Sequence, residues 1–319
     1  MFDTNRAFGC TSDGRYLMGT VLEITLCDRP TTTPQQSVQT TDDLFAATAR
    51  LEALLSTFSP ESSVSFLNAH AGQGGYRVPP EVFTLLSLAL QYWFLTQGTF
   101  DITVGPFMKM WGRAGQTQTI PSSEALQKER ARIGGNKISL LPNERVSLTH
   151  KGMTIDLGGI GKGYALDHLV GILKTRAISN ALLDFGQSSV WALGAPSDAP
   201  HWRLLVQRPN GQHVGVIALH DQALSISASF GQTFNIQGQQ YGHVIDPRSG
   251  KPLQRDLLAC VIAPTATEAE ALSKALLILG EEGGISLLER LPHVEGFLGE
   301  ANERQWMTTG WRFHRPDDH

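Results

Sequence analysis

The order of helical and strand patterns along this chain restricts its fold more than any other feature. Helical patterns come early, over 44–58 and 79–97, and again late, after residue 268. Most of the strand-like runs are crowded between residues 137 and 246. Regular alternation of strands and helices is typical of parallel α/β sheets, whereas segregated runs are typical of the α+β class. The sequence therefore predicts an α+β fold.

Hydrophobic periodicity places the individual elements. We expect strands over 16–27, 137–149, 180–193, 202–208, 213–219, 223–228, 241–246, 294–298 and 304–308. We expect helices over 44–58, 79–97, 125–133, 161–175, 268–279 and 284–291, and a polar loop over 29–42. No internal repeat or long linker divides the chain, so we predict a single domain over 16–312 between short tails at 1–15 and 313–319.

The composition excludes several classes of protein. Hydrophobic residues make up 41% and charged residues 18% of the 319 residues, which is ordinary for a globular protein and unlike a disordered chain. A formal net charge of −4 disfavours nucleic acid as a partner, since phosphate backbones bind basic surfaces. The most apolar run, 82–95, is shorter than the roughly 20 residues that span a bilayer. We therefore expect no transmembrane segment.

Two features bear on the cellular compartment. The first residues contain no apolar segment of the kind found in secretory leaders. As the sequence stands we expect a cytoplasmic protein, and a periplasmic or membrane-associated one if a leader has been removed. The three cysteines, Cys10, Cys27 and Cys260, are widely spaced and odd in number. We expect them to be small buried hydrophobic residues rather than a disulfide framework or a metal site.

A glycine-rich stretch, "TIDLGGIGKGYALDHL" from Thr154 to Leu169, precedes the helical pattern at 161–175. It matches neither the P-loop nor the dinucleotide-binding fingerprint. Its glycines allow a ligand to approach the backbone closely, and the free N–H groups of a helix N-terminus attract anions. Lys162 adds a positive charge. The stretch therefore predicts a phosphate site, and a tight turn without any ligand is the alternative.

Two further stretches contain residues that are able to take part in chemistry. In "GTFDITVGPFMKMWG", from Gly98 to Gly112, Asp101 either caps a turn or belongs to an aromatic-lined pocket. In "YGHVIDPRSGKP", from Tyr241 to Pro252, we place His243 in an apolar strand just before an Asp-Pro turn. A strand histidine is usually structural, but imidazole titrates near neutral pH and is suited to act as a general base.

A fourth stretch, "TATEAEALSKALLIL", begins the late helix. Thr267 and Glu270 are spaced as a capping box, in which each side chain accepts a hydrogen bond from the backbone of the other residue. Glu270 and Lys274 are also spaced as an i,i+4 ion pair, which stabilises an exposed helix face by only about 0.2–0.5 kcal/mol.

Taken in order, these stretches resemble the ApbE family, the FAD:protein FMN transferases. The resemblance runs from about Met18 to Gly280. It includes "MGT" at Met18, "STF" at Ser56, "GTFDITVGPF" at Gly98, "DLGGIGKGYALD" at Asp156, "YGHVIDPRSGKP" at Tyr241 and "IAPTATEAEALSKALLILG" at Ile262. Several long motifs in the family's order make the match specific.

The resemblance implies an α+β, two-lobed fold with FAD in a cleft between the lobes. It implies transfer of FMN from FAD to a Ser or Thr hydroxyl of a partner protein, with release of AMP. Some members also hydrolyse FAD to FMN and AMP. His243 is the implied base for the acceptor hydroxyl, and the glycine turn is the implied diphosphate site. The implied FAD contacts are Met18, Phe58, Thr99, Phe100, Asp101, Asp156, Lys162 and Val244.

The implied metal site departs from the family pattern. Family members hold Mg²⁺ with a backbone oxygen that corresponds to Gly159 and with an Asp and a Thr that correspond to Glu270 and Lys274. The usual "GGD" and "SGDY" motifs read "GQS" (186–188) and "SASF" (227–230) here. Two hypotheses follow. One is an active transferase in which Lys274 replaces part of the metal's charge and Glu270 positions it. The other is an FAD-binding relative without transferase activity, acting as a flavin carrier or an assembly factor.

Overall fold

An eight-stranded antiparallel sheet forms the centre of the computed structural model, which describes residues 9–27, 34–208, 210–230, 233–301 and 304–314. Its strands, in spatial order, are β1 (Cys10–Leu17), β2 (Thr20–Cys27), β6 (Ala181–Phe185), β7 (Ser189–Leu193), β10 (Gln222–Ala228), β15 (Leu257–Ala263), β16 (Glu295–Glu300) and β17 (Gln305–Met307). Every neighbouring pair in this order is antiparallel. The predicted α+β class is confirmed.

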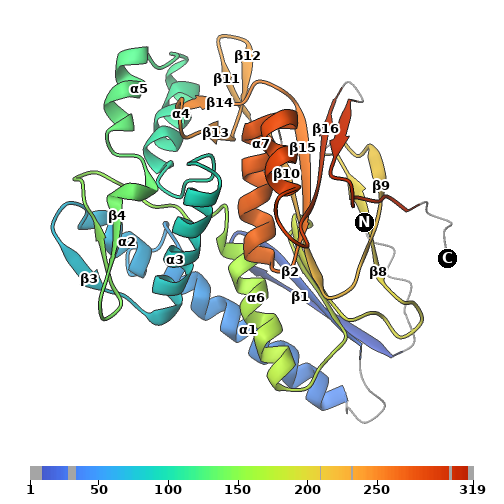
Figure 1. Cartoon of the computed structure of the whole chain (residues 1–319). Helices are drawn as coiled ribbons and strands as arrows, with labels where there is room; N and C mark the ends of the chain where they lie inside the picture. Colours follow the sequence, from blue (N-terminus) through green and yellow to red (C-terminus); the bar gives the residue numbers. More distant parts are fainter. Residues whose placement is uncertain (1–8, 28–33, 209, 231–232, 302–303, 315–319) are drawn as a thin grey trace.

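Three long helices cover one face of the sheet (Figure 1): α1 (Pro34–Leu55), α6 (Gly161–Thr175) and α7 (Ala266–Leu288). Leu272 and Leu276 of α7 pack into one hydrophobic cluster with Val261 of β15. A hairpin of β8 (Trp202–Gln207) and β9 (His213–Leu219) covers the opposite face, where Trp202 packs into a second cluster with Cys260. The central strands are therefore buried on both faces.

Smaller elements lie beside the helical layer, on the left and at the top of Figure 1. They are α2 (Ser63–Ala69), β3 (Gly75–Arg77), α3 (Pro80–Leu95), α4 (Gly105–Thr117), α5 (Ser123–Arg130), η1 (Gly135–Lys137), β4 (Ile138–Leu141), β5 (Arg145–Leu148), β11 (Thr233–Ile236), β12 (Gln239–Gly242), β13 (Ile245–Asp246) and β14 (Lys251–Pro252). The strands β3, β5 and β4 form a small antiparallel sheet. Phe107 and Trp111 of α4 pack with Ile236 and Tyr241 in a cluster of their own.

Three of the predicted strand runs are hairpins in the structure, and the one at 137–149 forms β4 and β5. The run predicted at 16–27 starts at Cys10 and turns back at Met18 and Gly19, whose φ angles are 47° and 81°. The run predicted at 180–193 turns at Gly186 and Gln187, whose φ angles are 67° and 57°. Apolar residues continue on both sides of each turn, so the hydrophobic pattern does not mark the break.

Other boundaries differ for local reasons. Helix α1 begins at Pro34, inside the predicted polar loop. Helix α4 was not predicted because it starts with Gly105-Pro106, a pair typical of turns, although Pro is favourable in the first helical turn. Strand β15 was missed because a strand buried on both faces shows no alternation. The two predicted late helices merge into α7, with Gly280 (φ 71°) as a non-helical residue inside it.

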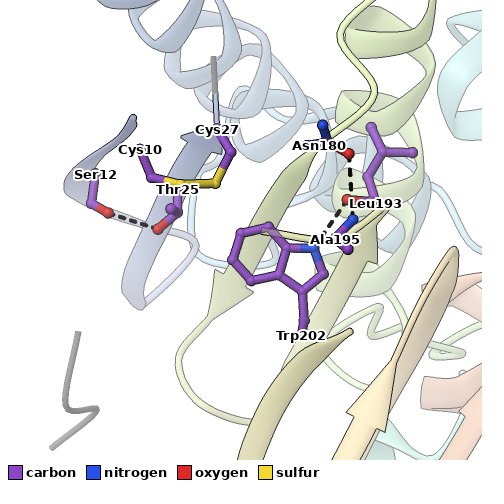
Figure 2. The surroundings of a disulfide bond; sticks show 8 residues. All are labelled: Cys10, Ser12, Thr25, Cys27, Asn180, Leu193, Ala195 and Trp202. Carbon is purple, nitrogen blue, oxygen red and sulfur yellow. Dashed lines mark hydrogen bonds between the residues drawn. A yellow bond between two sulfur atoms is a disulfide. The ribbon is translucent and has the colours of Figure 1, made fainter. Parts of the chain in front are cut away.

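The expectation that no cysteine forms a disulfide is wrong: Cys10 is bonded to Cys27 (Figure 2). The hairpin that turns at Met18 brings these two residues directly opposite each other at the open end of β1 and β2. A hydrogen bond of 2.7 Å between the hydroxyls of Ser12 and Thr25 links the same two strands. Cys260 is buried and unpaired, as expected.

Removing the disulfide should destabilise the fold measurably. The double variant Cys10→Ser/Cys27→Ser should lose about 2–4 kcal/mol of unfolding free energy, because the crosslink restricts the unfolded chain. Urea unfolding with and without a reducing agent measures this loss. The wild-type protein should be less stable in reductant, whereas the double variant should not respond to it. Equal stability of the wild-type protein in both conditions would contradict the disulfide.

The N-terminal turns of α6 and α7 touch at Gly163, and a methyl group there should disrupt the contact. A Cβ on Gly163 would lie 2.4 Å from the carbonyl oxygen of Ala266. Gly163→Ala should therefore cost about 1–3 kcal/mol of unfolding free energy. Gly171→Ala, in the same helix with open space around it, is the matched control and should stabilise by about 0.5–1 kcal/mol. Similar urea midpoints for the two variants would refute the close approach.

Candidate active site

The glycine turn leads into α6 and is held by two hydrogen bonds of Asp156. The amide of Asp156 donates to the carbonyl of Ile102 (2.7 Å), and Oδ1 of Asp156 accepts from the amide of Gly158 (2.8 Å). The N-cap residue of α6, Ile160, provides no side-chain hydrogen bond to the helix. An uncapped helix N-terminus has a partial positive charge and N–H groups that bind anions.

Three residues predicted from separate motifs meet at this turn. A Cβ built on Gly161 would lie 3.4 Å from Cε of Met18, at the tip of the β1–β2 hairpin. A Cβ built on Gly159 would lie 3.7 Å from the ring of Phe100 and 3.9 Å from Cε of Lys274. The structure therefore brings Met18, Phe100 and Lys274 together around the predicted phosphate site.

Lys162 lies on the first turn of α6, and its ammonium group donates to the hydroxyl of Ser188. The carboxyl of Asp184, which is 6% exposed, accepts a hydrogen bond from the amide of Gln187 (2.8 Å). Burial raises the pKa of Asp184 to about 6; the charge of Glu23 adds to this rise, while the Gln187 hydrogen bond and the charge of Lys162 oppose it. Ser188, the last residue of the "GQS" motif that differs from the family pattern, therefore lies beside Lys162.

Thr99 and Asp101 are buried, and their side chains bind within the protein. Asp101 accepts hydrogen bonds from the indole of Trp93 (2.9 Å) and from the amide and the hydroxyl of Thr103 (2.7 and 2.6 Å). Thr99 donates to the carbonyl of Thr96 (2.9 Å). Burial raises the pKa of Asp101, and these hydrogen bonds oppose the rise. Both residues fix the loop that presents Phe100.

His243 and Val244 are half-buried and lie between β12 and β13, not inside a strand as predicted. The following turn is tied to α4, because the indole of Trp111 donates to the carbonyl of Gly250 (2.8 Å). The carbonyl of Val244 accepts from the amide of Leu253 (2.9 Å). Phe58, in a turn after α1, is 95% exposed.

The predicted capping box on α7 is wrong. The N-cap is Thr265, whose hydroxyl accepts from the amide of Glu268 (3.2 Å). Thr267 instead donates to Asp167, which also accepts from the amides of Ala266 (2.8 Å) and Thr267 (2.9 Å). Sequence reasoning missed Asp167, the last residue of "DLGGIGKGYALD"; a carboxylate at the end of a long motif was the available signal.

Glu270 does not lie on an exposed helix face; it is fully buried. Its Oε1 accepts from the hydroxyl of Ser189, whereas its Oε2 has no hydrogen-bond partner among the described residues. Lys274, one turn further along α7, is partly buried. Burial lowers the pKa of Lys274, the negative charge of Glu270 opposes this, and the positive charge of Lys162 adds to it. The charges of Glu270 and Lys162 thus both act on Lys274, beside the glycine turn.

The raised pKa of Asp184 predicts that replacing this residue changes the stability of the protein by an amount that depends on pH. Because the folded state favours the protonated carboxyl, the contribution of Asp184 to stability is present in acid and is lost as the pH rises through about 6. Asp184→Asn should avoid this loss, so its stability relative to wild type should improve by about 2 kcal/mol from about pH 4 to about pH 8. Urea unfolding at both pH values measures the difference. Exposed Asp198→Asn controls for the lost charge, and a pH-independent Asp184→Asn difference would disprove the effect.

Comparison with known proteins identifies the family. Residues 18–298 match the model of the ApbE family. The chain is 30% identical over 284 residues to the FAD:protein FMN transferase of Klebsiella pneumoniae, covering 83% of this chain and 79% of the relative. It is 29% identical over 248 residues to the enzyme of the same name from Escherichia coli, covering 75% and 70%.

Solved structures have the same fold. The crystal structure of the ApbE protein from Thermotoga maritima superposes with a TM-score of 0.83 at 25% identity, over 94% of this chain and 97% of that one. The flavin transferase ApbE from Vibrio cholerae superposes with a TM-score of 0.81 at 22% identity, over the same shares of the two chains. The motifs, the family match and the fold agree: this chain is a member of the ApbE family.

Proposed function

We propose that this protein is an FAD:protein FMN transferase, which moves the FMN part of FAD onto a Ser or Thr hydroxyl of an acceptor protein and releases AMP. One observation supports this most: the glycine turn leads into an uncapped helix N-terminus whose first turn contains Lys162, and Lys274 of α7 lies beside the same glycine turn. Backbone N–H groups and lysine ammonium groups are what a diphosphate binds. The curated relatives with this name support the same reaction.

In the proposed complex the FAD diphosphate lies at the glycine turn, next to Gly159 and Lys162. Met18 borders the turn and offers apolar surface to the rings of FAD, whereas Phe100 is only 5% exposed and supports the turn from within the core. The exposed ring of Phe58 is available to stack on a flavin or an adenine. Val244 is proposed as a further contact. We assign Asp156 to the turn itself, and Thr99 and Asp101 to positioning Phe100, because their side chains bind within the protein.

The proposed reaction is an in-line displacement at phosphorus. The acceptor hydroxyl oxygen forms a bond to the FMN phosphorus while the bond from that phosphorus to the bridging oxygen breaks, and AMP leaves with that oxygen. The imidazole of His243 takes the proton of the acceptor hydroxyl. Negative charge grows on the leaving phosphate, so Lys162 and the N-terminus of α6 stabilise the transition state more than the bound substrate. If water replaces the acceptor, the same step hydrolyses FAD to FMN and AMP.

The second candidate function is FAD binding without transfer, as a flavin carrier or an assembly factor. It is favoured by the altered pair on α7, where Glu270 and Lys274 stand at the positions of the family's metal ligands. The two functions differ in two products, AMP and the modified acceptor. Purified protein incubated with FAD and an acceptor domain should yield AMP in step with an acceptor whose mass has increased by one FMN. FAD recovered intact, with an acceptor that another family member modifies, would favour binding alone.

We propose an oxidising compartment for this protein. The bond between Cys10 and Cys27 is the reason, because disulfides persist outside the reducing cytosol. No helix within the described ranges is long and apolar enough to cross a membrane. The partner is an acceptor flavoprotein subunit or domain that carries the target hydroxyl. Alkylation of the unfolded protein tests for the disulfide on which this proposal rests: one thiol should react without reductant and all three with it.

Replacing the proposed base should affect the chemical step and not FAD binding. His243→Ala should slow transfer of FMN by about 10²–10⁴-fold, the usual contribution of general base catalysis. Its affinity for FAD, measured by flavin fluorescence, should stay at the wild-type value. His150→Ala, an exposed histidine on another loop, is the matched control and should leave both quantities unchanged. Full activity of His243→Ala would remove His243 from the mechanism.

A further inference from the structure

We propose that Lys274, one turn along α7 from the buried carboxylate of Glu270, supplies positive charge directly to the FAD diphosphate, so that FMN transfer proceeds without a bound divalent cation. This inference rests on the proposed function. It assigns to one lysine of α7 the electrostatic work that a metal ion performs in many phosphoryl-transfer enzymes.

The position of Lys274 beside the glycine turn is the first observation that supports this role. Its Cε lies 3.9 Å from a Cβ built on Gly159, and the ring of Phe100 lies at 3.7 Å from the same point. The ammonium group is one bond beyond Cε, so it lies within a few ångströms of the glycine turn. A diphosphate seated on this turn would contact Lys162 from α6 and Lys274 from α7.

The buried carboxylate of Glu270 is the second observation that supports this role. Its side chain is 0% exposed, and its Oε2 lacks a hydrogen-bond partner among the described residues. An unpaired carboxylate oxygen is costly to bury unless a positive charge lies near it. Lys274 follows Glu270 by one helical turn on α7, and the negative charge of Glu270 acts on it. Ser189 donates to the other oxygen, which holds the carboxylate in place.

The residues present do not fit Mg²⁺. This ion takes six oxygen ligands in nearly ideal octahedral geometry, usually with one or two carboxylates. Across the part of the chain that the structure describes, no group of three or more His, Cys, Asp or Glu side chains is arranged to hold a metal ion. Glu270 offers one carboxylate, and Lys274 brings a positive charge that repels a cation at the same place. We therefore derive no step through a metal.

Replacing the charge of Lys274 tests the inference on the full-length protein. In EDTA, Lys274→Met should raise the Kd for FAD by about tenfold to a hundredfold, as expected for the loss of a charge-assisted contact. Its affinity for riboflavin, which lacks the diphosphate, should not change. Lys274→Arg should keep most of the FAD affinity. Lys128→Met, on the exposed face of α5, is the matched control for net charge and should bind FAD like the wild type.

The metal is tested separately on the wild-type protein. Transfer of FMN should proceed equally fast in Mg²⁺ and in EDTA, and electron paramagnetic resonance should find added Mn²⁺ free in solution. Transfer that stops in EDTA and resumes with Mg²⁺, or Mn²⁺ binding that is lost in Glu270→Gln, would overturn the inference. An unchanged Kd of Lys274→Met for FAD would also overturn it. If the Met variant fails to fold, these wild-type measurements still decide.

The same experiments separate this inference from the proposed function. A wild-type protein that binds FAD but modifies no acceptor, with or without Mg²⁺, overturns the proposed transferase. The FAD affinities of the Lys274 variants would then still show whether this lysine binds the diphosphate. Active transfer that depends on Mg²⁺ has the opposite meaning, because it supports the transferase and rejects the role of Lys274.

Discussion

The contact between the first turns of α6 and α7 is the constraint on which the rest of the site depends. Asp167 of α6 accepts hydrogen bonds from the first amides of α7, and Gly163 allows the two backbones to touch. Because this crossing fixes both helices, the glycine turn at the start of α6 lies beside the side chain that α7 presents at Lys274. The central sheet therefore supports α6 and α7 as two helices that are already held together by this contact.

A second set of contacts positions the loops around these helices. The amide of Asp156 binds the carbonyl of Ile102, which joins the Phe100 loop to the glycine turn. Trp111 of α4 binds the turn that follows His243. Each of these bonds links segments that are far apart in the sequence. The site is therefore built from hydrogen bonds between loops, and the buried carboxylate of Asp101 adds hydrogen bonds within one of them.

The sequence predicted the fold class and the bounds of helix α6. Through the family resemblance it also predicted that the four motifs lie near one another in the fold. It failed where the chain reverses within an apolar run. The turn at Met18 was invisible to periodicity, so the pairing of Cys10 with Cys27 was missed. It failed again at Glu270, because i,i+4 spacing does not reveal whether a helix face is exposed. Burial depends on what packs against the helix, and only the structure supplies that.

The β1–β2 hairpin has the disulfide at its open end and Met18 at its turn. Strand β1 is an edge strand whose residues are mostly exposed, so little side-chain packing fixes its register on β2. A slip by one residue would displace the turn and carry Met18 away from Gly161. The disulfide makes that slip impossible without breaking a covalent bond. A crosslink far from the glycine turn thereby keeps one wall of the site in register.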